Sequence, residues 1–161
     1  MSLIAVLSRR AMLAASLAVV LACATEVQAA TNSLVIAGAW TRPAAVGVNG
    51  AGYLSITNKG RTAERLTGAS SAAAARVSIH ESRMVGQVMT MRALGEVAIP
   101  PGATVTFKPG GRHLMLEALK APLKAGDQIA LTLVFATAGR RSVLLAVRDG
   151  PPAPAMADMK M

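Results

Sequence analysis

The feature that most constrains this chain is a succession of short apolar runs between Leu34 and Arg148, each closed by turn-forming residues. The runs are rich in Val, Ile, Leu and Thr, and they show little helical periodicity, so they are predicted to be β-strands. Nine strands are predicted, over residues 34–40, 51–57, 65–69, 76–81, 87–91, 104–108, 112–118, 128–136 and 142–148. So many short strands in a chain of one-domain length indicate an all-β sandwich or barrel.

The first residues have the pattern of a secretory signal peptide. Arg9 and Arg10 are followed by fourteen uncharged residues, 11–24, a stretch too short to span a bilayer comfortably. Val27-Gln28-Ala29 then fits the small-x-small pattern that precedes a cleavage point. We therefore expect a signal peptide over residues 1–29 and export of the remainder.

Two variants of this export signal stay open. Ser8-Arg9-Arg10-Ala11-Met12-Leu13 resembles a twin-arginine signal. Val20-Leu21-Ala22-Cys23 resembles a lipobox, which would make Cys23 a lipidated N-terminus; the preferred interpretation is that Cys23 is removed with the signal peptide.

The exported part divides into a folded domain over residues 30–150 and a tail over residues 151–161. The tail begins with Pro-Pro-Ala-Pro and contains Met156, Met159 and Met161. Such a segment has too few core-forming residues to pack, so it is predicted to be flexible.

Composition excludes several classes of function. The chain has 17 Lys and Arg against 8 Asp and Glu, for a net charge of +9, but only four aromatic residues. A basic nucleic-acid-binding protein usually offers aromatic platforms among its charges, so nucleic-acid binding is not expected. Cys23 is the only cysteine, which excludes an internal disulfide, a CxxC redox pair and a thiolate-rich zinc site. If Cys23 is removed with the signal peptide, the mature chain also lacks the cysteine that a blue-copper site requires.

The two histidines, His80 and His113, are predicted to lie in strands near methionines. Strand alternation places His113 and Met115 on one face, and Met89 and Met91 likewise share a face. The aliphatic neighbours of the histidines lie across the pleat and are expected to face the core: Val77 and Ile79 beside His80, and Leu114 and Leu116 beside His113. Val88 likewise lies across the pleat from Met89 and Met91.

Methionine is an unusual residue for an outward strand position, because its thioether gains nothing from water. Neutral thioether sulfur prefers Cu(I), and imidazole also binds copper. The combination of imidazoles and thioethers on outward faces therefore predicts a copper site.

The spacing of these residues resembles a known signature. His80, ten residues, Met91, twenty-one residues and then His113-Leu114-Met115 is similar to the H-x10-M-x21-H-x-M pattern of the periplasmic copper(I) chaperones called PCu(A)C. Further similarity runs from residue 34 to 148, including Ala39-Trp40-Thr41-Arg42, Gly52-Tyr53-Leu54, Thr57-Asn58-Lys59-Gly60 and Lys108-Pro109-Gly110-Gly111-Arg112.

The resemblance implies a cupredoxin-like Greek-key β-sandwich or barrel that is not an enzyme. It implies one Cu(I) bound at an exposed site by His80, Met91, His113 and Met115. It further implies a periplasmic monomer that carries copper toward the CuA centre of cytochrome c oxidase subunit II, or toward another periplasmic copper carrier.

Several assignments are left open by the resemblance. Met84, Met89 and the tail residues Met156, Met159 and Met161 are candidates for secondary copper contacts, and scaffold roles are the alternative. Glu81 and Glu117 flank the histidines and are candidates for orienting an imidazole N–H. Two other functions remain for the whole chain: copper buffering or resistance without dedicated delivery, and a β-sandwich scaffold that binds no metal.

Overall fold

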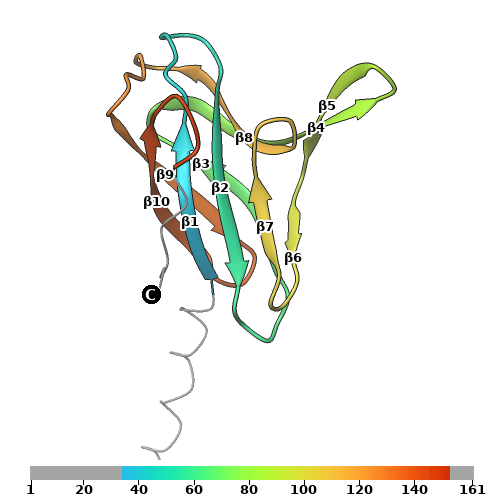
Figure 1. Cartoon of the computed structure of the whole chain (residues 1–161). Coiled ribbons are helices and arrows are strands. Elements are labelled where there is room, and N and C mark those ends of the chain that lie inside the picture. Colours follow the sequence, from blue (N-terminus) through green and yellow to red (C-terminus); the bar gives the residue numbers. More distant parts are fainter. Residues whose placement is uncertain (1–33, 153–161) are drawn as a thin grey trace, which may run out of the picture. The chain divides into compact units, whose positions relative to one another are not determined.

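A computed structural model describes residues 34–152, which form ten β-strands and no helix (Figure 1). Their bounds are β1 Leu34–Thr41, β2 Gly50–Asn58, β3 Glu64–Ser70, β4 Ala74–Val85, β5 Val88–Leu94, β6 Val97–Ile99, β7 Thr104–Phe107, β8 Arg112–Leu119, β9 Gln128–Phe135 and β10 Gly139–Val147. No segment within this range is a helix that could cross a bilayer.

Seven of the strands close into a barrel. Their order is β4-β8-β2-β1-β10-β9-β3, and the pair Ala69 with Val77 joins β3 back to β4. The pairings are antiparallel except for β1 with β10, which are parallel. Neighbours in the sheet are often distant in the sequence, as β8 between β4 and β2 illustrates. The all-β fold, a cupredoxin-like Greek-key barrel, is confirmed.

Each of the nine predicted strands corresponds to an observed strand, and the differences concern lengths and one omission. The strand β6 was not predicted, because three residues between Gly95 and Pro100 are too short to show alternation. It pairs with β3 and buries Val97 and Ile99. The strand β4 is longer than predicted and continues to Val85, since it pairs along its whole outer half with β5.

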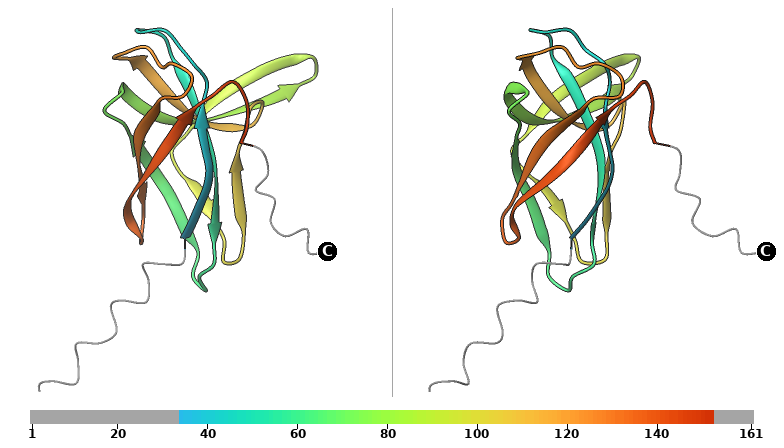
Figure 2. Two further views of the ribbon diagram at one scale, coloured as in Figure 1. Left: turned by 60° about the vertical axis from the view of Figure 1, so that its left-hand side comes forward. Right: turned by 90° about the vertical axis from the view of Figure 1, so that its left-hand side faces the viewer.

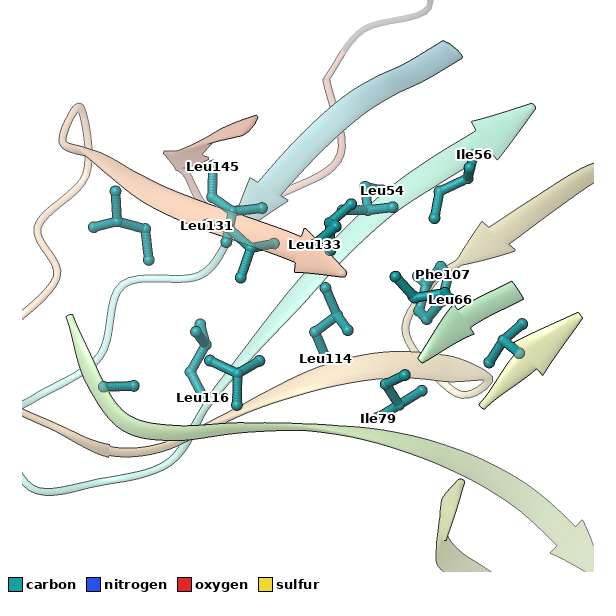
Figure 3. Close-up of a cluster of buried hydrophobic side chains, with 14 of the residues drawn as sticks. Leu54, Ile56, Leu66, Ile79, Phe107, Leu114, Leu116, Leu131, Leu133 and Leu145 are labelled. Atoms are coloured by element: carbon teal, nitrogen blue, oxygen red, sulfur yellow. The ribbon is translucent and has the colours of Figure 1, made fainter. Parts of the chain in front are cut away.

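The core lies inside the barrel and is built by alternation. In β9 every second residue, from Ile129 to Phe135, is buried, and the intervening ones face outward. Figure 3 shows leucines from several strands meeting in this core. The fully buried aliphatic side chains come from six strands: Ile56, Leu66, Ile99, Leu114, Leu116, Leu119, Leu131, Leu133, Leu145 and Val147. Burial of this apolar area provides the main driving force for folding.

The hairpin formed by β4 and β5 extends beyond the body of the barrel (Figures 1 and 2). Its turn has Gly86 at a φ of 63°, in the left-handed region that a side chain disfavours. Glycine at the first central position is typical of a two-residue type II′ turn, whose twist suits an antiparallel hairpin. The strand β4 thus runs continuously from the barrel wall to the hairpin tip.

A buried carboxylate, Glu64, links β3 to the end of β9. It is 7% exposed and accepts hydrogen bonds from the backbone N–H groups of Arg65 at 2.9 Å, Thr137 at 3.0 Å and Ala138 at 2.8 Å. Burial alone would raise the pKa of Glu64, but these three hydrogen bonds together with the nearby Arg65 charge lower it below the usual value.

Substituting Glu64→Gln should therefore make the free energy of unfolding less dependent on pH in the acidic range. Because the folded-state pKa lies below the unfolded value, the ionised carboxylate stabilises the fold above about pH 4.5, and this contribution is lost as pH falls through the folded-state pKa. At neutral pH we expect the amide to cost about 1 to 3 kcal/mol, since it cannot accept all three hydrogen bonds equally well.

The measurement is chemical denaturation between pH 7 and pH 3. Glu96→Gln is the matched control, because Glu96 is exposed and forms only a surface ion pair with Arg65 at 3.4 Å. Identical pH slopes for wild type and Glu64→Gln would contradict the prediction.

Candidate metal centre

The two histidines lie side by side on the outer face of the barrel. The strands β5, β4 and β8 are adjacent, and the antiparallel register pairs His80 of β4 directly with His113 of β8. Their ring centroids are 5.9 Å apart, with the ring planes inclined by 31°. Tertiary pairing thus brings together residues that are 33 positions apart in the chain.

Two methionines share this face, one on each side of the histidine pair. Met115 of β8 is paired with Ser78 of β4, and Met91 of β5 is paired with Ser82 of β4. Directly paired residues in antiparallel strands project to the same face, so His80, Met91, His113 and Met115 project together. As expected, the intervening Leu114 and Leu116 point into the core and are fully buried.

The four side chains differ in exposure. Met91 is 52% exposed, whereas His113 is only 6% exposed although it lies on the outer face. A cavity of about 250 Å³ adjoins this region and is lined by Tyr53, Met91, Pro109, Gly110, His113, Met115 and several small residues of β2 and β4. The β7–β8 loop and Tyr53 therefore shield His113, and Met91 lies at the open side.

Tyr53 is itself held in place by an aromatic contact. Trp40 of β1 is paired with Tyr53 of β2, and their ring centroids are 4.7 Å apart. Both rings are buried on the outer face, outside the aliphatic core. Trp40 therefore packs against Tyr53, which lines the wall of the cavity.

The hydrogen bonds of His113 determine its tautomer. Its Nδ1 lies 3.0 Å from the carbonyl oxygen of Gly111. A carbonyl oxygen can only accept, so Nδ1 carries the hydrogen and donates it. The lone pair available for a metal is therefore on Nε2.

His80 is oriented by a chain of side-chain hydrogen bonds. Arg76 donates to Glu117 at 3.0 and 3.2 Å, and Ser78 donates its hydroxyl hydrogen to Glu117 at 2.5 Å. The Ser78 oxygen then accepts from Nε2 of His80 at 3.0 Å. The hydrogen bond from Ser78, followed by that from Arg76, holds the pKa of Glu117 below its usual range, so this carboxylate stays ionised.

This chain leaves the other ring nitrogen of His80 available. Because Nε2 carries the hydrogen, the lone pair is on Nδ1, which is buried and has no hydrogen-bond partner among residues 34–152. A buried polar atom without a partner is costly, and a metal ion is one group that would satisfy it. Two imidazole lone pairs and two neutral sulfur atoms are a donor set suited to Cu(I).

Glu81 does not take part in this arrangement. It projects from the opposite face of β4, where it accepts hydrogen bonds from Arg92 at 3.0 Å and Arg83 at 3.2 Å and pairs with Arg112 at 3.5 Å. The hydrogen bond from Arg92 is the main cause that lowers the pKa of Glu81. Of the two carboxylates considered from the sequence, only Glu117 is linked to a histidine, and the link runs through the Ser78 hydroxyl.

The other candidate ligands are placed as follows. Met84 and Met89 lie on the same face as Met91 but further along the hairpin, where they are paired with each other. Met156, Met159, Met161 and Cys23 lie outside the described residues. Within residues 34–152 no group of three or more His, Asp or Glu is close enough to hold a metal ion, so a copper site there depends on the thioethers.

Comparison with known proteins supports the resemblance seen in the sequence. The family model described as "LpqE-like: Putative lipoprotein LpqE-like" matches residues 34–147, which is most of the chain. The barrel matches several solved PCuAC domains over nearly their whole length. The chain belongs to the LpqE-like, or PCu(A)C, family.

Individual relatives of this PCu(A)C chain include proteins bound to copper. The copper-bound PCuAC domain from PmoF2 is 25% identical with a TM-score of 0.62, covering 75% of this chain and 97% of that domain. The solution structure of CuI-DR1885 from Deinococcus radiodurans is 28% identical with a TM-score of 0.55, covering 74% and 83%. The "Putative lipoprotein Lxx21020" of Leifsonia xyli subsp. xyli is 34% identical over 119 residues, covering 73% of this chain and 71% of the relative.

Three parts of the candidate site were not found from the sequence. Ser78 was missed, although it lies two residues before His80 and alternation already places it on the same face. The shielding by Tyr53 and by residues 109–111 depends on pairings between distant strands. No local signal indicates those pairings.

Ser78 provides a test of how the PCu(A)C chain orients its ligand. Substituting Ser78→Ala removes the hydrogen bond to His80 and frees the imidazole to rotate, so Cu(I) affinity should fall about 10- to 100-fold. The measurement is competition for Cu(I) against a chromophoric chelator. Ser82→Ala, on the same strand and face but without a hydrogen bond to His80, is the matched control. Equal affinities of the two variants would count against an orienting role.

Proposed function

We propose that this chain is a periplasmic copper(I) chaperone that binds one Cu(I) through His80, Met91, His113 and Met115. The observation that carries this proposal is the buried Nδ1 of His80, which lacks a partner and belongs to the ring paired with His113. Two thioethers project from the same face on either side of these rings. Copper-bound relatives with the same fold support the metal.

The chemistry of the donor set favours Cu(I). All four donors are neutral, so the complex would carry only the single charge of the ion. Thioether sulfur is a soft ligand that binds Cu(I) well and binds Zn²⁺ or Mg²⁺ poorly. In the assigned tautomers each neutral imidazole offers one lone pair, on Nδ1 of His80 and on Nε2 of His113, so both rings can act as uncharged ligands.

Delivery follows from the unequal exposure of the donors. His113 is shielded, whereas Met91 lies at the open side of the cavity. An incoming ligand from an acceptor can replace Met91 first while the histidines still hold the ion. We propose that the acceptor is the CuA domain of cytochrome c oxidase subunit II, and that the chaperone acts as a monomer without catalysing a reaction.

Export to the periplasm is part of the proposal. Residues 1–29 have the signal-peptide pattern. The matching family and the Leifsonia xyli relative are both named as putative lipoproteins. Those names support export, and they support the alternative in which Cys23 is lipidated. Mass spectrometry of the protein purified from membranes and from periplasm would distinguish cleavage after Ala29 from lipidation at Cys23.

The delivery step requires a transfer experiment. Copper-loaded protein, residues 30–161, is mixed with the copper-free soluble domain of oxidase subunit II, the two proteins are separated at successive times, and the copper content of each is measured. Transfer at a rate above that of free Cu(I) chelate supports the chaperone. Tight binding without transfer would instead favour a copper buffer.

The tail gives a separate prediction. Because the four proposed ligands lie between residues 80 and 115, truncation after Gly150 should leave one tight Cu(I) equivalent with unchanged affinity. Any additional, weaker equivalents lost on truncation would belong to Met156, Met159 and Met161. Loss of the tight equivalent itself would contradict the core assignment, and no tight equivalent in the full protein would favour the metal-free scaffold.

A further inference from the structure

One face of the β4–β5 hairpin carries three thioethers. Met84 of β4 and Met89 of β5 are directly paired, and Met91 follows two residues further along β5 on the same face. Direct cross-strand neighbours have Cβ atoms about 4.5–5.5 Å apart, a separation that flexible methionine side chains easily bridge to one ion. The hairpin projects from the barrel, so this face is open (Figures 1 and 2).

These methionines are exposed without an evident packing role. Met84 is 55% exposed, Met89 is 56% exposed and Met91 is 52% exposed. Exposed thioethers contribute nothing to the core, and three of them on one face are unusual for a soluble surface. Packing therefore does not explain these three residues. The chemical group that they share is the thioether, which is a soft ligand for Cu(I).

The charges of the hairpin lie on its other face. Arg83 and Arg92 belong to the face of Glu81, and both donate hydrogen bonds to that carboxylate. The thioether face contains Ser82, Ala93 and the three methionines, and it carries no charged side chain between the tip and His80. A monovalent cation would meet no fixed positive charge on this face.

A continuous path leads from the tip to the histidines. Successive positions on one face of a strand are about 7 Å apart. The Met84–Met89 pair is followed by the Ser82–Met91 pair and then by His80, beside His113. On the β8 side of Ser82 lies Gly111, whose carbonyl accepts from the Ser82 N–H at 3.0 Å and which has no side chain to obstruct the path. Met91 is the only soft ligand in the middle row.

We propose that Met84, Met89 and Met91 form an outer Cu(I) site, and that the ion passes from it to His80, His113 and Met115. Met91 belongs to both ligand sets, so it remains bound while the other sulfur atoms are exchanged for imidazole nitrogens one at a time. Copper stays Cu(I) throughout, and no electron or proton is transferred. This inference rests on the proposed function and extends it to the route by which the ion enters.

The decisive experiment isolates the outer site by disabling the inner one. Cu(I) held by bicinchoninate is titrated into His80→Ala/His113→Ala protein, residues 30–150, so that the tail methionines do not contribute. We expect one residual, weaker Cu(I) equivalent, and we expect it to be lost when Met84→Leu and Met89→Leu are added. Leucine keeps the apolar surface of the hairpin but removes sulfur.

Two further measurements keep the test interpretable. In protein with both histidines intact, Met84→Leu/Met89→Leu should leave the affinity of the tight equivalent unchanged and slow its loading from the chelator. The ε-methyl NMR signals of Met84 and Met89 should shift when Ag(I), a redox-inert analogue of Cu(I), is added to the His80→Ala/His113→Ala protein. The NMR experiment leaves the methionines of the hairpin in place, so it detects the outer site without substituting its ligands.

The control and the contrary outcomes are distinct. Val85→Ser/Val88→Ser alters the opposite, aliphatic face of the tip and should change neither binding nor loading. An equal effect of these serine variants would show that the hairpin acts through its apolar surface and not through sulfur, and would overturn the outer site. Absence of the residual equivalent, with the tight equivalent intact in wild type, would refute only this inference. Absence of any tight equivalent in wild type would refute the proposed function.

Discussion

Replacing His113 with alanine is expected to lower the Cu(I) affinity of the exported protein by roughly 100-fold or more, since loss even of groups that merely orient a ligand costs 10- to 100-fold. The substitution removes the Nε2 lone pair whose direction is set by the Nδ1 hydrogen bond to Gly111. The remaining ligand set then contains one imidazole nitrogen, Nδ1 of His80, and two thioethers, which together bind Cu(I) more weakly. Competition titration against a chromophoric Cu(I) chelator measures the change.

Companion variants separate a ligand effect from a folding effect. Met91→Ile and Met115→Ile should each weaken binding while preserving apolar volume. Thr90→Ala, next to Met91 but on the other face of β5, is the control and should bind like wild type. Thermal unfolding of each variant verifies the fold. An unchanged tight equivalent in His113→Ala protein with intact unfolding behaviour would disprove the ligand assignment.

Replacing Leu114 with alanine is expected to destabilise the fold by about 3 kcal/mol, within the roughly 2–5 kcal/mol range for buried leucines. Leu114 is fully buried and lies between His113 and Met115, so its side chain anchors the ligand strand β8 to the core. Truncation leaves a cavity beneath that strand and removes apolar burial at the same time. The midpoint of thermal unfolding should fall by on the order of 10 °C.

The matched control for this substitution is Leu144→Ala. Leu144 of β10 is 57% exposed, so its truncation creates no cavity and should change stability by no more than about 0.5 kcal/mol. Chemical denaturation of both variants at the same pH gives the comparison. Similar losses in the two proteins would mean that the barrel core does not depend on Leu114.

Much of the fold was predictable because strand alternation is a local property. The pattern of β9, with Ile129, Leu131, Leu133 and Phe135 at every second position, identifies a strand with one buried face before any partner is known. Nine strands were found in this way. The strand β6 was missed, because Val97 and Ile99 alone are too few for a pattern and become a strand only through pairing with β3.

The length of β4 shows the same limit. Residues after Glu81 contain serine, arginine and methionine, which are not typical of a strand core, so the prediction ended there. The strand continues because β5 pairs with it as far as Val85 and Gly86 supplies the turn. Hairpin pairing and turn geometry therefore determined the projecting element that carries Met84 and Met89.

The candidate site was predictable in its residues but not in its arrangement. The spacing of His80, Met91 and His113-Leu114-Met115 identified the candidates, and alternation placed each away from the aliphatic face. The near-complete burial of His113 was not expected for an outward residue. It arises because Tyr53 and the loop before β8 shield the ring, and these segments are brought there by strand pairing.

By itself the sequence determined the fold class, the face of each strand on which the histidines and methionines lie, and the soft character of the donor set. These follow from the two-residue period of a strand and from side-chain chemistry, which are local. Tertiary structure alone decided that β4 lies between β5 and β8, that His80 faces His113, and that Ser78 links His80 to Glu117. Those outcomes depend on the register between strands distant in the chain, which is set by closing the barrel around one core.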